Sequence, residues 1–170
     1  MTDPVYRNAV PADAATVAAL ARRTFDETFG HLYAPEDLAL FLGRLTEASY
    51  ADELANPAFA IRLVEVGGAV VGYAKIGPPS LPFTPPAKAI ELRQFYVLAP
   101  FHGGGIAPAL MDWVIAEARA RGMSALYLSV FTDKHRARRF YARYGFEEVG
   151  PYAFKVGNHE DEDIVMRRDL

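Results

Sequence analysis

The segment IELRQFYVLAPFHGGGIAPALMDWVIAEARAR, Ile90–Arg121, decides the fold of this 170-residue chain. Its first nine residues include β-branched and aromatic side chains, which are typical of a strand. Three glycines follow, Gly103–Gly105, and apolar residues then recur at helical spacing from about Pro108. A strand that ends in glycines and opens a helix leaves backbone N–H groups free at the helix N-terminus, where a partial positive charge favours an anion. The segment therefore predicts a site for a phosphate group.

Three other kinds of site use glycines in this way. A nucleoside triphosphate loop needs Lys-Ser/Thr after the glycines, and Ile106-Ala107 stands there instead. A dinucleotide fold needs an acid after the next strand, but the predicted strand Ala125–Val130 leads into Phe131. The sequence His102–Gly105 also matches the oxyanion hole of some hydrolases, whose nucleophile elbow Gly-x-Ser-x-Gly is missing from this sequence. None of the three fits.

Hydrophobic periodicity and turn residues predict the other elements. Strands are expected at Val5–Ala9, Phe59–Val66, Ala69–Ile76, Ile90–Leu98, Ala125–Val130, from Phe146 to Val149 and beyond, and at Asp163–Arg167. Helices are expected over 14–29, from Pro35 to about Leu45, over 47–56, over 108–121 and over 136–144. Asp13 is expected to cap the first helix, and the acidic run Glu160–Asp163 is expected to lie between the last two strands. Five prolines between Pro78 and Pro86 predict a loop. This loop is either a surface excursion between two strands or a rim over a pocket.

The order of these elements predicts an α+β (mixed α/β) fold. We expect a mostly antiparallel sheet of about seven strands, flanked by about four helices. The two strands Ile90–Leu98 and Ala125–Val130 should be its parallel pair, because a helix joins them. The length suits a single domain, 1–170.

Composition excludes several functions. The formal net charge of −3 gives no basic field for nucleic acid. The absence of cysteine excludes disulfides and thiol chemistry, and four scattered histidines predict no metal site. No apolar run is long enough to span a membrane, and the first residues do not resemble a signal peptide, so we expect a soluble cytoplasmic protein.

Two motifs resemble one known family. His102–Ala107 resembles the acyl-CoA-binding turn of the GCN5-related N-acetyltransferases (GNAT), Gln/Arg-x-x-Gly-x-Gly/Ala, although His102 replaces the first residue. Phe140–Phe146 resembles the family's stretch Phe-Tyr-x-Lys/Arg-x-Gly-Phe. The stretch Thr24–Leu38 is also similar to the PaiA-type polyamine N-acetyltransferases of bacteria. The resemblance implies a GNAT-like sheet with a splayed parallel pair and a single acetyltransferase domain.

The resemblance implies acetyl-CoA as cosubstrate, with no metal, and an amine that attacks the thioester directly. The residues that it implies for acetyl-CoA are Phe95, Tyr96, Val97, His102, Gly103, Gly104, Gly105, Ile106, Ala107, Lys134, Ala137 and Arg143. Lys134 stands where the family has asparagine, and it either pairs with a phosphate or faces water. Arg143 either reaches the cosubstrate or lies on a solvated helix face.

Tyr141 and Glu91 are the expected catalytic residues. The resemblance implies Tyr141 as general acid near the CoA sulfur, and the alternative is a core aromatic. Glu91 precedes the catalytic strand segment and is a candidate general base acting through water; the alternative is an outward strand residue or a partner of Arg93.

The early helices are expected to form the acceptor side, with Phe25, Glu27, Phe29 and Tyr33 as substrate-binding residues. Acids at Asp26, Glu27, Glu36 and Asp37 would favour a cationic amine such as a polyamine, unless they are only solvated. The partner is then a small-molecule amine, with no nucleic acid and no membrane, and the chain is a monomer or homodimer. A non-catalytic CoA-binding regulatory module, or acetylation of a protein N-terminus or lysine, are the alternatives.

Overall fold

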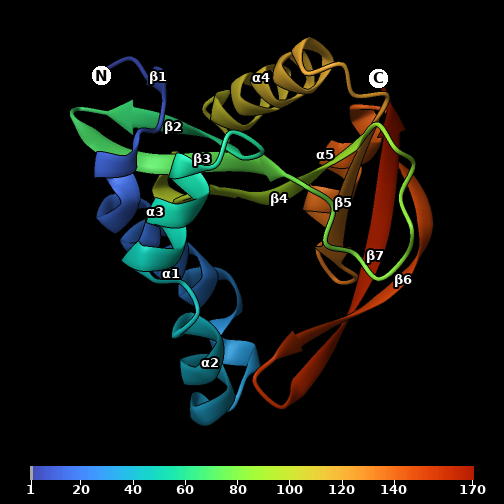
Figure 1. The fold of residues 1–170 in the computed structure, drawn as a ribbon. Coiled ribbons are helices and arrows are strands. Elements are labelled where there is room, and N and C mark those ends of the chain that lie inside the picture. The colour runs from blue at the N-terminus through green and yellow to red at the C-terminus, as the bar shows by residue number, and fades with distance from the viewer. Residues whose placement is uncertain (1) are drawn as a thin grey trace.

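The computed structural model describes residues 2–170; Met1, the first residue of the predicted single domain, lies outside the described residues. Within residues 2–170, seven strands form one sheet in the order β1-β2-β3-β4-β5-β7-β6 (Figure 1). Of these strands only β4 and β5 pair in parallel, which confirms the predicted mixed sheet. The strands are β1 (Val5–Asn8), β2 (Ala60–Val66), β3 (Ala69–Gly77), β4 (Ala89–Val97), β5 (Ala125–Phe131), β6 (Glu147–Val156) and β7 (His159–Asp169).

Five α-helices accompany the sheet in the described part of the chain, and each overlaps one of the five ranges predicted as helical, in agreement with the approximate expectation of about four. Helix α4 lies on one side of β2, β3 and β4, and α1 with α3 lies on the other (Figure 1). The helices are α1 (Ala14–Phe29), α2 (Pro35–Leu42), α3 (Glu47–Ala55), α4 (Ile106–Ala120) and α5 (His135–Arg143). Short 3₁₀ turns are η1 (Pro11–Asp13), η2 (Gly30–Leu32) and η3 (Ala99–Phe101).

Apolar stripes hold α1 and α4 on the sheet. Val17 and Ala21 of α1 are buried, and so are Leu110 and Val114 of α4, which follow each other at helical spacing. Each large apolar side chain buried in this way stabilises the fold by about 1.5–3 kcal/mol relative to leaving it exposed. The two helices therefore cover the sheet from opposite sides and fix the frame on which the loops stand.

The prediction that the Asp13 side chain caps α1 is wrong. Asp13 precedes the helix, but its carboxylate makes no capping bond there. It accepts a hydrogen bond from the Val10 backbone N–H at 2.7 Å and pairs with Arg7 at 2.8 Å. Because the Asp13 carboxylate pairs with the Arg7 guanidinium, it does not accept from the free amides of α1. The same pairing lowers the pKa of Asp13.

The prediction that the acidic run Glu160–Asp163 lies between strands is also wrong. These residues belong to β7, and β6 and β7 pair over their whole length up to the two-residue turn Gly157-Asn158. In the run, Asp161 and Asp163 face inward while the glutamates between and before them are exposed. Charge at the inward positions conceals the strand periodicity, because an inward-facing strand position is normally apolar.

The tip of the β6–β7 hairpin reaches α2, beside which it lies in Figure 1. Asp37 of α2 accepts a hydrogen bond from the Asn158 backbone N–H at 2.8 Å. Gly157 has φ of 60°, and a Cβ there would lie 2.6 Å from the Asp37 Cα. Only glycine therefore permits this close approach, which joins the N-terminal helices to the far end of the sheet.

The parallel pair opens after three residues, and this opening is the main structural feature of the molecule. β4 and β5 pair only from Ala89 to Glu91. Beyond that point β4 continues beside β3 to Val97, while β5 continues beside β7 to Phe131. The β3–β4 register also shifts at Arg93, where β4 carries one extra residue. The backbone of β4 from Leu92 onward therefore has no strand partner on its β5 side within residues 2–170.

Candidate active site

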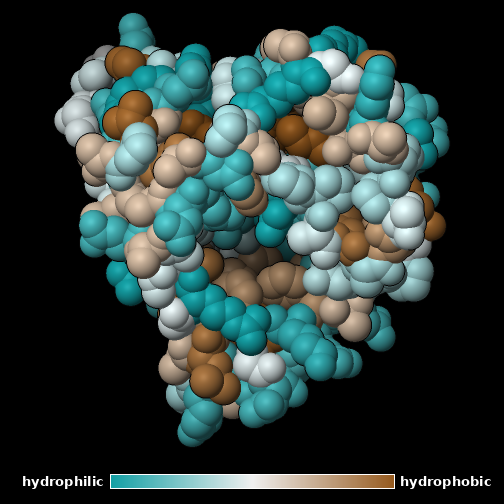
Figure 2. Space-filling view, in the orientation of Figure 1, coloured by the Kyte–Doolittle hydropathy of each residue, from teal (hydrophilic) through white to brown (hydrophobic). Residues whose placement is uncertain are grey.

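A cavity of about 420 Å³ occupies the space between the diverging strands. Its walls come from β4, β5, α1, α5 and the β6–β7 hairpin. Figure 2 shows it as a hollow in the face of the molecule, with hydrophobic residues at its floor. A volume of this size suits a small molecule.

The glycine loop follows β4 at the end of the cavity that His102 lines. Gly103 and Gly105 have φ of 81° and 82°, in the left-handed region that favours glycine. A Cβ at either position would meet no atom within 4 Å, so the outer side of the loop is open. Helix α4 begins at Ile106, two residues before the predicted start, and its first-turn amides point away from the helix. The loop fits a diphosphate bound by backbone N–H groups.

His102 is exposed, and its ring is held on the end of β4. Its Nε2 lies 2.7 Å from the Val97 carbonyl oxygen, to which an Nε2–H donates. Only Nδ1 is then free to meet a ligand.

Tyr141 of α5 lines the cavity and is only 9% exposed. Its ring packs edge-on against Phe95 of β4, with ring centroids 6.3 Å apart. Burial raises the pKa of its phenol, and among residues 2–170 no hydrogen bond contributes to that pKa. The phenol is therefore protonated at neutral pH and its proton is available to a group in the cavity.

The other residues implied for the cosubstrate lie in two places. Phe95, Tyr96, Val97, Lys134 and Ala137 line the cavity, whereas Gly103–Ala107 lie beyond its His102 end and Arg143 lies in the last turn of α5 outside it. The Nζ of Lys134 lies 5.2 Å from the centroid of the Phe29 ring, and desolvation lowers the pKa of this amine. Burial raises the pKa of Tyr96, because it disfavours the charged phenolate.

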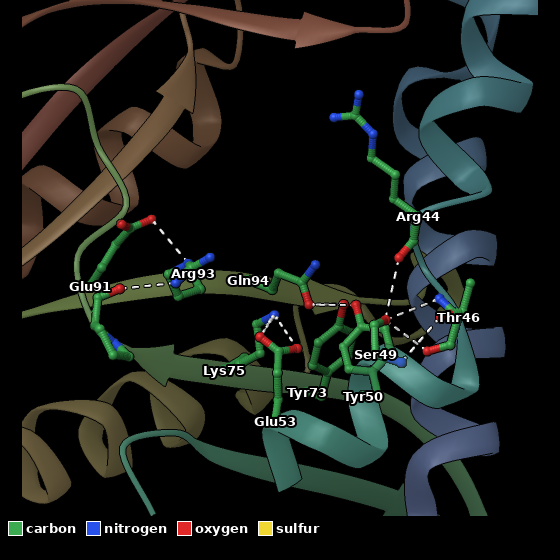
Figure 3. A network of polar contacts seen from close by, with 11 residues as sticks. Arg44, Thr46, Ser49, Tyr50, Glu53, Tyr73, Lys75, Glu91, Arg93 and Gln94 are labelled. Atoms are coloured by element: carbon green, nitrogen blue, oxygen red, sulfur yellow. Dashed lines mark hydrogen bonds and ion pairs between the residues drawn. The ribbon is translucent and has the colours of Figure 1, made fainter. Parts of the chain in front are cut away.

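Glu91 lies in the cavity wall and is 5% exposed. Its Oε1 accepts hydrogen bonds from the Ser80 backbone N–H at 2.7 Å and from the Ser80 hydroxyl at 3.1 Å. Its Oε2 is 3.7 Å from the Arg93 guanidinium (Figure 3). Burial raises the pKa of Glu91, against these hydrogen bonds and the charge of Arg93. Ser80 belongs to the proline-rich loop, so that loop forms part of the wall.

A second polar network, which sequence reasoning missed, lies beside Glu91, and its members Lys75 and Gln94 line the cavity (Figure 3). The Nζ of Lys75 donates to both carboxylate oxygens of Glu53, at 2.9 and 3.0 Å. The Oε1 of Gln94 accepts from the hydroxyls of Tyr50 at 2.7 Å and Tyr73 at 3.0 Å. Burial raises the pKa of Tyr50 to about 12 and lowers that of Lys75. Helix α3 is thus fixed to the floor of the cavity by charge and hydrogen bonds.

Three of the four residues expected on the acceptor side line the cavity: Phe25, Phe29 and Tyr33. Phe25 packs on Tyr33 with ring centroids 6.0 Å apart. The structure does not bring Glu27 to the cavity. It lies on the outer face of α1, where it pairs with Arg23 at 3.0 Å. An i,i+4 pair so exposed contributes about 0.3–0.5 kcal/mol.

Two acids that were not expected in the site do line the cavity, namely Asp161 and Asp163 of β7. Each is 8% exposed. The signal that could have found them is the alternation Asp161-x-Asp163-x-Val165, which places all three residues on one face of a strand.

Within residues 2–170 no three His, Asp or Glu side chains are arranged to hold a metal ion. In the same residues no helix is long and apolar enough to cross a membrane. The cavity instead combines a protonated phenol, an unpaired strand edge and, at its mouth, a cradle for an anion. Such a set can bind a phosphate-bearing molecule and give a proton to an atom of it.

Comparisons with known proteins place this geometry among relatives. Residues 17–146 match the model of the acetyltransferase (GNAT) family. An uncharacterized N-acetyltransferase of Mycobacterium bovis is 37% identical over 159 residues, covering 93% of this chain and 98% of the relative. The PaiA N-acetyltransferase of Thermoplasma acidophilum, solved in complex with coenzyme A, matches with a TM-score of 0.79 at 15% identity, over 99% of each chain. The putative acetyltransferase yncA of Salmonella typhimurium, solved with its cofactor acetyl-CoA, matches with a TM-score of 0.73 at 21% identity, over 99% of this chain and 95% of that one.

Proposed function

The chain belongs to the acetyltransferase (GNAT) family, and on this premise we propose that it transfers the acetyl group of acetyl-CoA to the nitrogen of a primary amine. The observation that carries the proposal is that Tyr141 and the unpaired edge of β4 meet in one cavity, at whose end the glycine loop lies. Acetyl-CoA supplies an acetyl thioester, whose carbonyl carbon accepts the amine and whose sulfur leaves.

The glycine loop is proposed to hold the diphosphate of acetyl-CoA. The positive φ of Gly103 and Gly105, together with the open space where a side chain would stand, supports this assignment. The backbone amides at the start of α4 carry the partial positive charge that an anion needs. His102 adds positive charge to this only as an imidazolium, because its Nε2–H donates to the Val97 carbonyl and the Nδ1 of a neutral ring would offer a lone pair and no proton.

Within the segment Phe95–Val97, the backbone N–H groups that point away from β3 are proposed to polarise the thioester carbonyl. The support is that β4 has no neighbouring strand on this side beyond Glu91. Donors that are fixed before the reaction stabilise developing charge without reorganising. Lys134, at the N-cap of α5, and Ala137, within it, lie on the opposite wall and are proposed to contact the cosubstrate there, with Arg143 outside the cavity at the end of the same helix.

Tyr141 is proposed to give its phenolic proton to the leaving sulfur. Its burial and the raised pKa of its hydroxyl keep the phenol protonated at neutral pH, so that it can donate a hydrogen bond to the sulfur as negative charge develops there and then pass its proton to the leaving thiolate. Glu91 is the proposed base for the amine. Its raised pKa makes the carboxylate a stronger base than an exposed one, and a water would relay the proton because Ser80 and Arg93 hold the carboxylate in the wall.

Tyr141→Phe tests the proposal. Isothermal titration should give a similar Kd for acetyl-CoA with the wild type and the variant, because the phenol oxygen is not part of the phosphate cradle. Thiol release should slow by about 10²–10⁴-fold, as expected when a general acid is lost. Tyr144→Phe is the matched control. Tyr144 is the C-cap of the same helix, but its hydroxyl donates to the Pro108 carbonyl and to the Asp112 carboxylate, outside the cavity.

The assay also separates the alternatives. A primary-amine panel that includes diamines and amino acids, with a short peptide added, reports the acceptor class through thiol release. Tight binding of acetyl-CoA with no turnover on any acceptor would favour a regulatory module, and turnover on the peptide alone would favour a protein acceptor. The polyamine acceptor, the cytoplasmic location, the single catalytic domain and the monomeric or homodimeric state expected from the sequence stay predictions.

A further inference from the structure

Two carboxylates of β7 meet in the cavity without enough partners. Asp161 and Asp163 alternate along the strand and therefore point to the same side, and each is 8% exposed. Asp161 accepts a hydrogen bond from the Tyr33 hydroxyl, and a second contact joins it to the His159 Nε2 at 3.1 Å. Its negative charge is therefore held in place by donors from both sides.

Asp163 has no such donors. Among residues 2–170 neither a hydrogen bond nor an ion pair neutralises its side chain, and the causes that act on its pKa are burial and the neighbouring charge of Asp161. Because it lines the cavity, its carboxylate can meet only what enters that cavity. A buried carboxylate without a donor is costly unless a cation or a proton compensates it.

We propose that Asp161 and Asp163 form a subsite that binds an ammonium group of the acceptor, one other than the nitrogen that is acetylated. The acceptor class is then an amine with a second cationic nitrogen, such as a diamine. This inference rests on the proposed function for its meaning, although the subsite itself can be measured by binding alone.

The choice of the second nitrogen follows from charge. Two carboxylates beside an amine favour its protonated form, and a protonated amine has no lone pair with which to attack a thioester. The same pair is suited to an ammonium that is only held. The reacting nitrogen would lie toward Tyr141, whose phenol serves the sulfur.

The other wall of the cavity favours an organic ammonium group over a metal ion. The two acids and His159 are not arranged to coordinate a metal. Phe25 and Phe29 of α1 face the cavity, and the Lys134 ammonium already lies over the Phe29 ring at 5.2 Å. Aromatic faces beside carboxylates attract organic ammonium groups.

These acids replace those to which the sequence pointed. Asp37 is bound to the Asn158 amide and Glu27 to Arg23, so neither is available in the cavity. Recognition of a cationic acceptor is instead assigned to the strand opposite the helices.

The test compares three acceptors that share one reacting amine and differ at the other end: 1,4-diaminobutane, 4-amino-1-butanol and 4-aminobutanoate. After correction for its two equivalent amines, the diamine should exceed the amino alcohol at least 10-fold in kcat/KM, because a charge-assisted hydrogen bond is lost in the alcohol. The anionic compound should be the poorest. Asp163→Asn should reduce the preference for the diamine to within about 3-fold, mainly through KM, and Asp161→Asn should reduce it too.

Glu162→Gln is the matched control, since Glu162 lies between the two acids but faces outward. It should leave the preference unchanged. Circular dichroism and acetyl-CoA titration establish that each variant is folded. An equal kcat/KM for diamine and amino alcohol in the wild type, or an undiminished preference in both Asp→Asn variants, would overturn the subsite.

Direct binding keeps the two proposals separate. Calorimetry of 1,4-diaminobutane with the CoA-saturated protein should give a Kd that rises at least 10-fold in Asp163→Asn. Binding that depends on Asp163 without any acetylation would sustain the subsite and refute the proposed function. Acetylation of the diamine with no dependence on Asp163 would refute the subsite and sustain the function.

Discussion

Replacing Asp163 by Asn should change how the stability of the protein depends on pH. Burial and the charge of Asp161 raise the pKa of Asp163 from its ordinary 3.8 to about 7. Between those two values the folded state binds the proton more tightly than the unfolded state does. Stability therefore falls as pH rises through this range, and an asparagine at the same place removes that fall because its amide does not ionise.

The expected magnitude follows from the two pKa values. One pKa unit corresponds to ~1.36 kcal/mol, so the raised pKa of Asp163 lowers the free energy of unfolding by roughly 1.7 kcal/mol at pH 5, where mainly the unfolded state has lost the proton, and by roughly 4 kcal/mol at pH 8. The free energy of unfolding of Asp163→Asn, relative to wild type, should thus increase by about 2–3 kcal/mol between these pH values.

Several other groups face Asp163, and the comparison of variants must allow for them. The titratable groups are Asp161 on β7, Tyr33 beside η2, Tyr96 on β4 and Tyr152 on β6. The cations in the same cavity are Lys75, Arg93 and Lys134. The tyrosine pKa values are raised, so these phenols remain neutral up to pH 8. The slope that distinguishes Asp163→Asn from wild type is therefore assigned to Asp163.

Urea denaturation at pH 5, 6, 7 and 8, at one ionic strength, measures the effect. Wild type, Asp163→Asn and the outward-facing control Glu162→Gln are compared, each without ligand. The control curve should run parallel to that of the wild type. If the Asp163→Asn curve is parallel to it as well, the pKa of Asp163 is not raised in the folded protein, and the reasoning from its burial is refuted.

Two further changes test the glycine cradle and the buried ion pair by chemical denaturation. Gly105→Ala should cost about 1–2 kcal/mol because alanine is strained at φ of 82°, whereas Gly104→Ala, at a position without positive φ, should change stability by less than about 0.5 kcal/mol; equal losses would contradict the assignment to strain. Glu53→Gln should destabilise the protein by about 3 kcal/mol because it leaves Lys75, whose side chain is 7% exposed, without its carboxylate. Adding Lys75→Met to that variant should restore most of the loss, and no recovery would mean that the pair acts through something other than uncompensated charge.

Much of the fold could be predicted because local signals agree with it. The Gly67-Gly68 hairpin, the glycine loop and the helix that follows it each have a short-range chemical cause, and the structure has all three near their expected places. The single parallel pair followed from one crossover helix between two strands. These features depend on residues that are neighbours in the sequence.

The cavity wall could be predicted less completely because it depends on residues brought together from distant parts of the chain. Glu53 and Lys75 are 22 residues apart, and Tyr33 and Asp161 are 128 apart. Nothing in the local pattern around Lys75 distinguishes a buried lysine from an exposed one. Glu27 illustrates the reverse case, since its helix is near the cavity but its position on that helix faces solvent. The direction in which a helical side chain faces is set by how the helix packs, and the acidic composition of a segment does not reveal that packing.

The position of Asp163 follows from the same opening that makes room for acyl transfer. In a closed parallel sheet, β4 would continue beside β5, and the inward side of β7 would be covered by apolar side chains, where a carboxylate could not remain ionised. Because β4 and β5 separate after Glu91, β7 faces a cavity instead of a packed core along the part of its length where Asp161 and Asp163 lie. The β7 sequence changes at the corresponding point, from acids at 161 and 163 to Val165, which packs in a core cluster. The opening that leaves the edge of β4 unpaired therefore also permits the two buried carboxylates on β7, to which the proposed subsite assigns the acceptor's second ammonium.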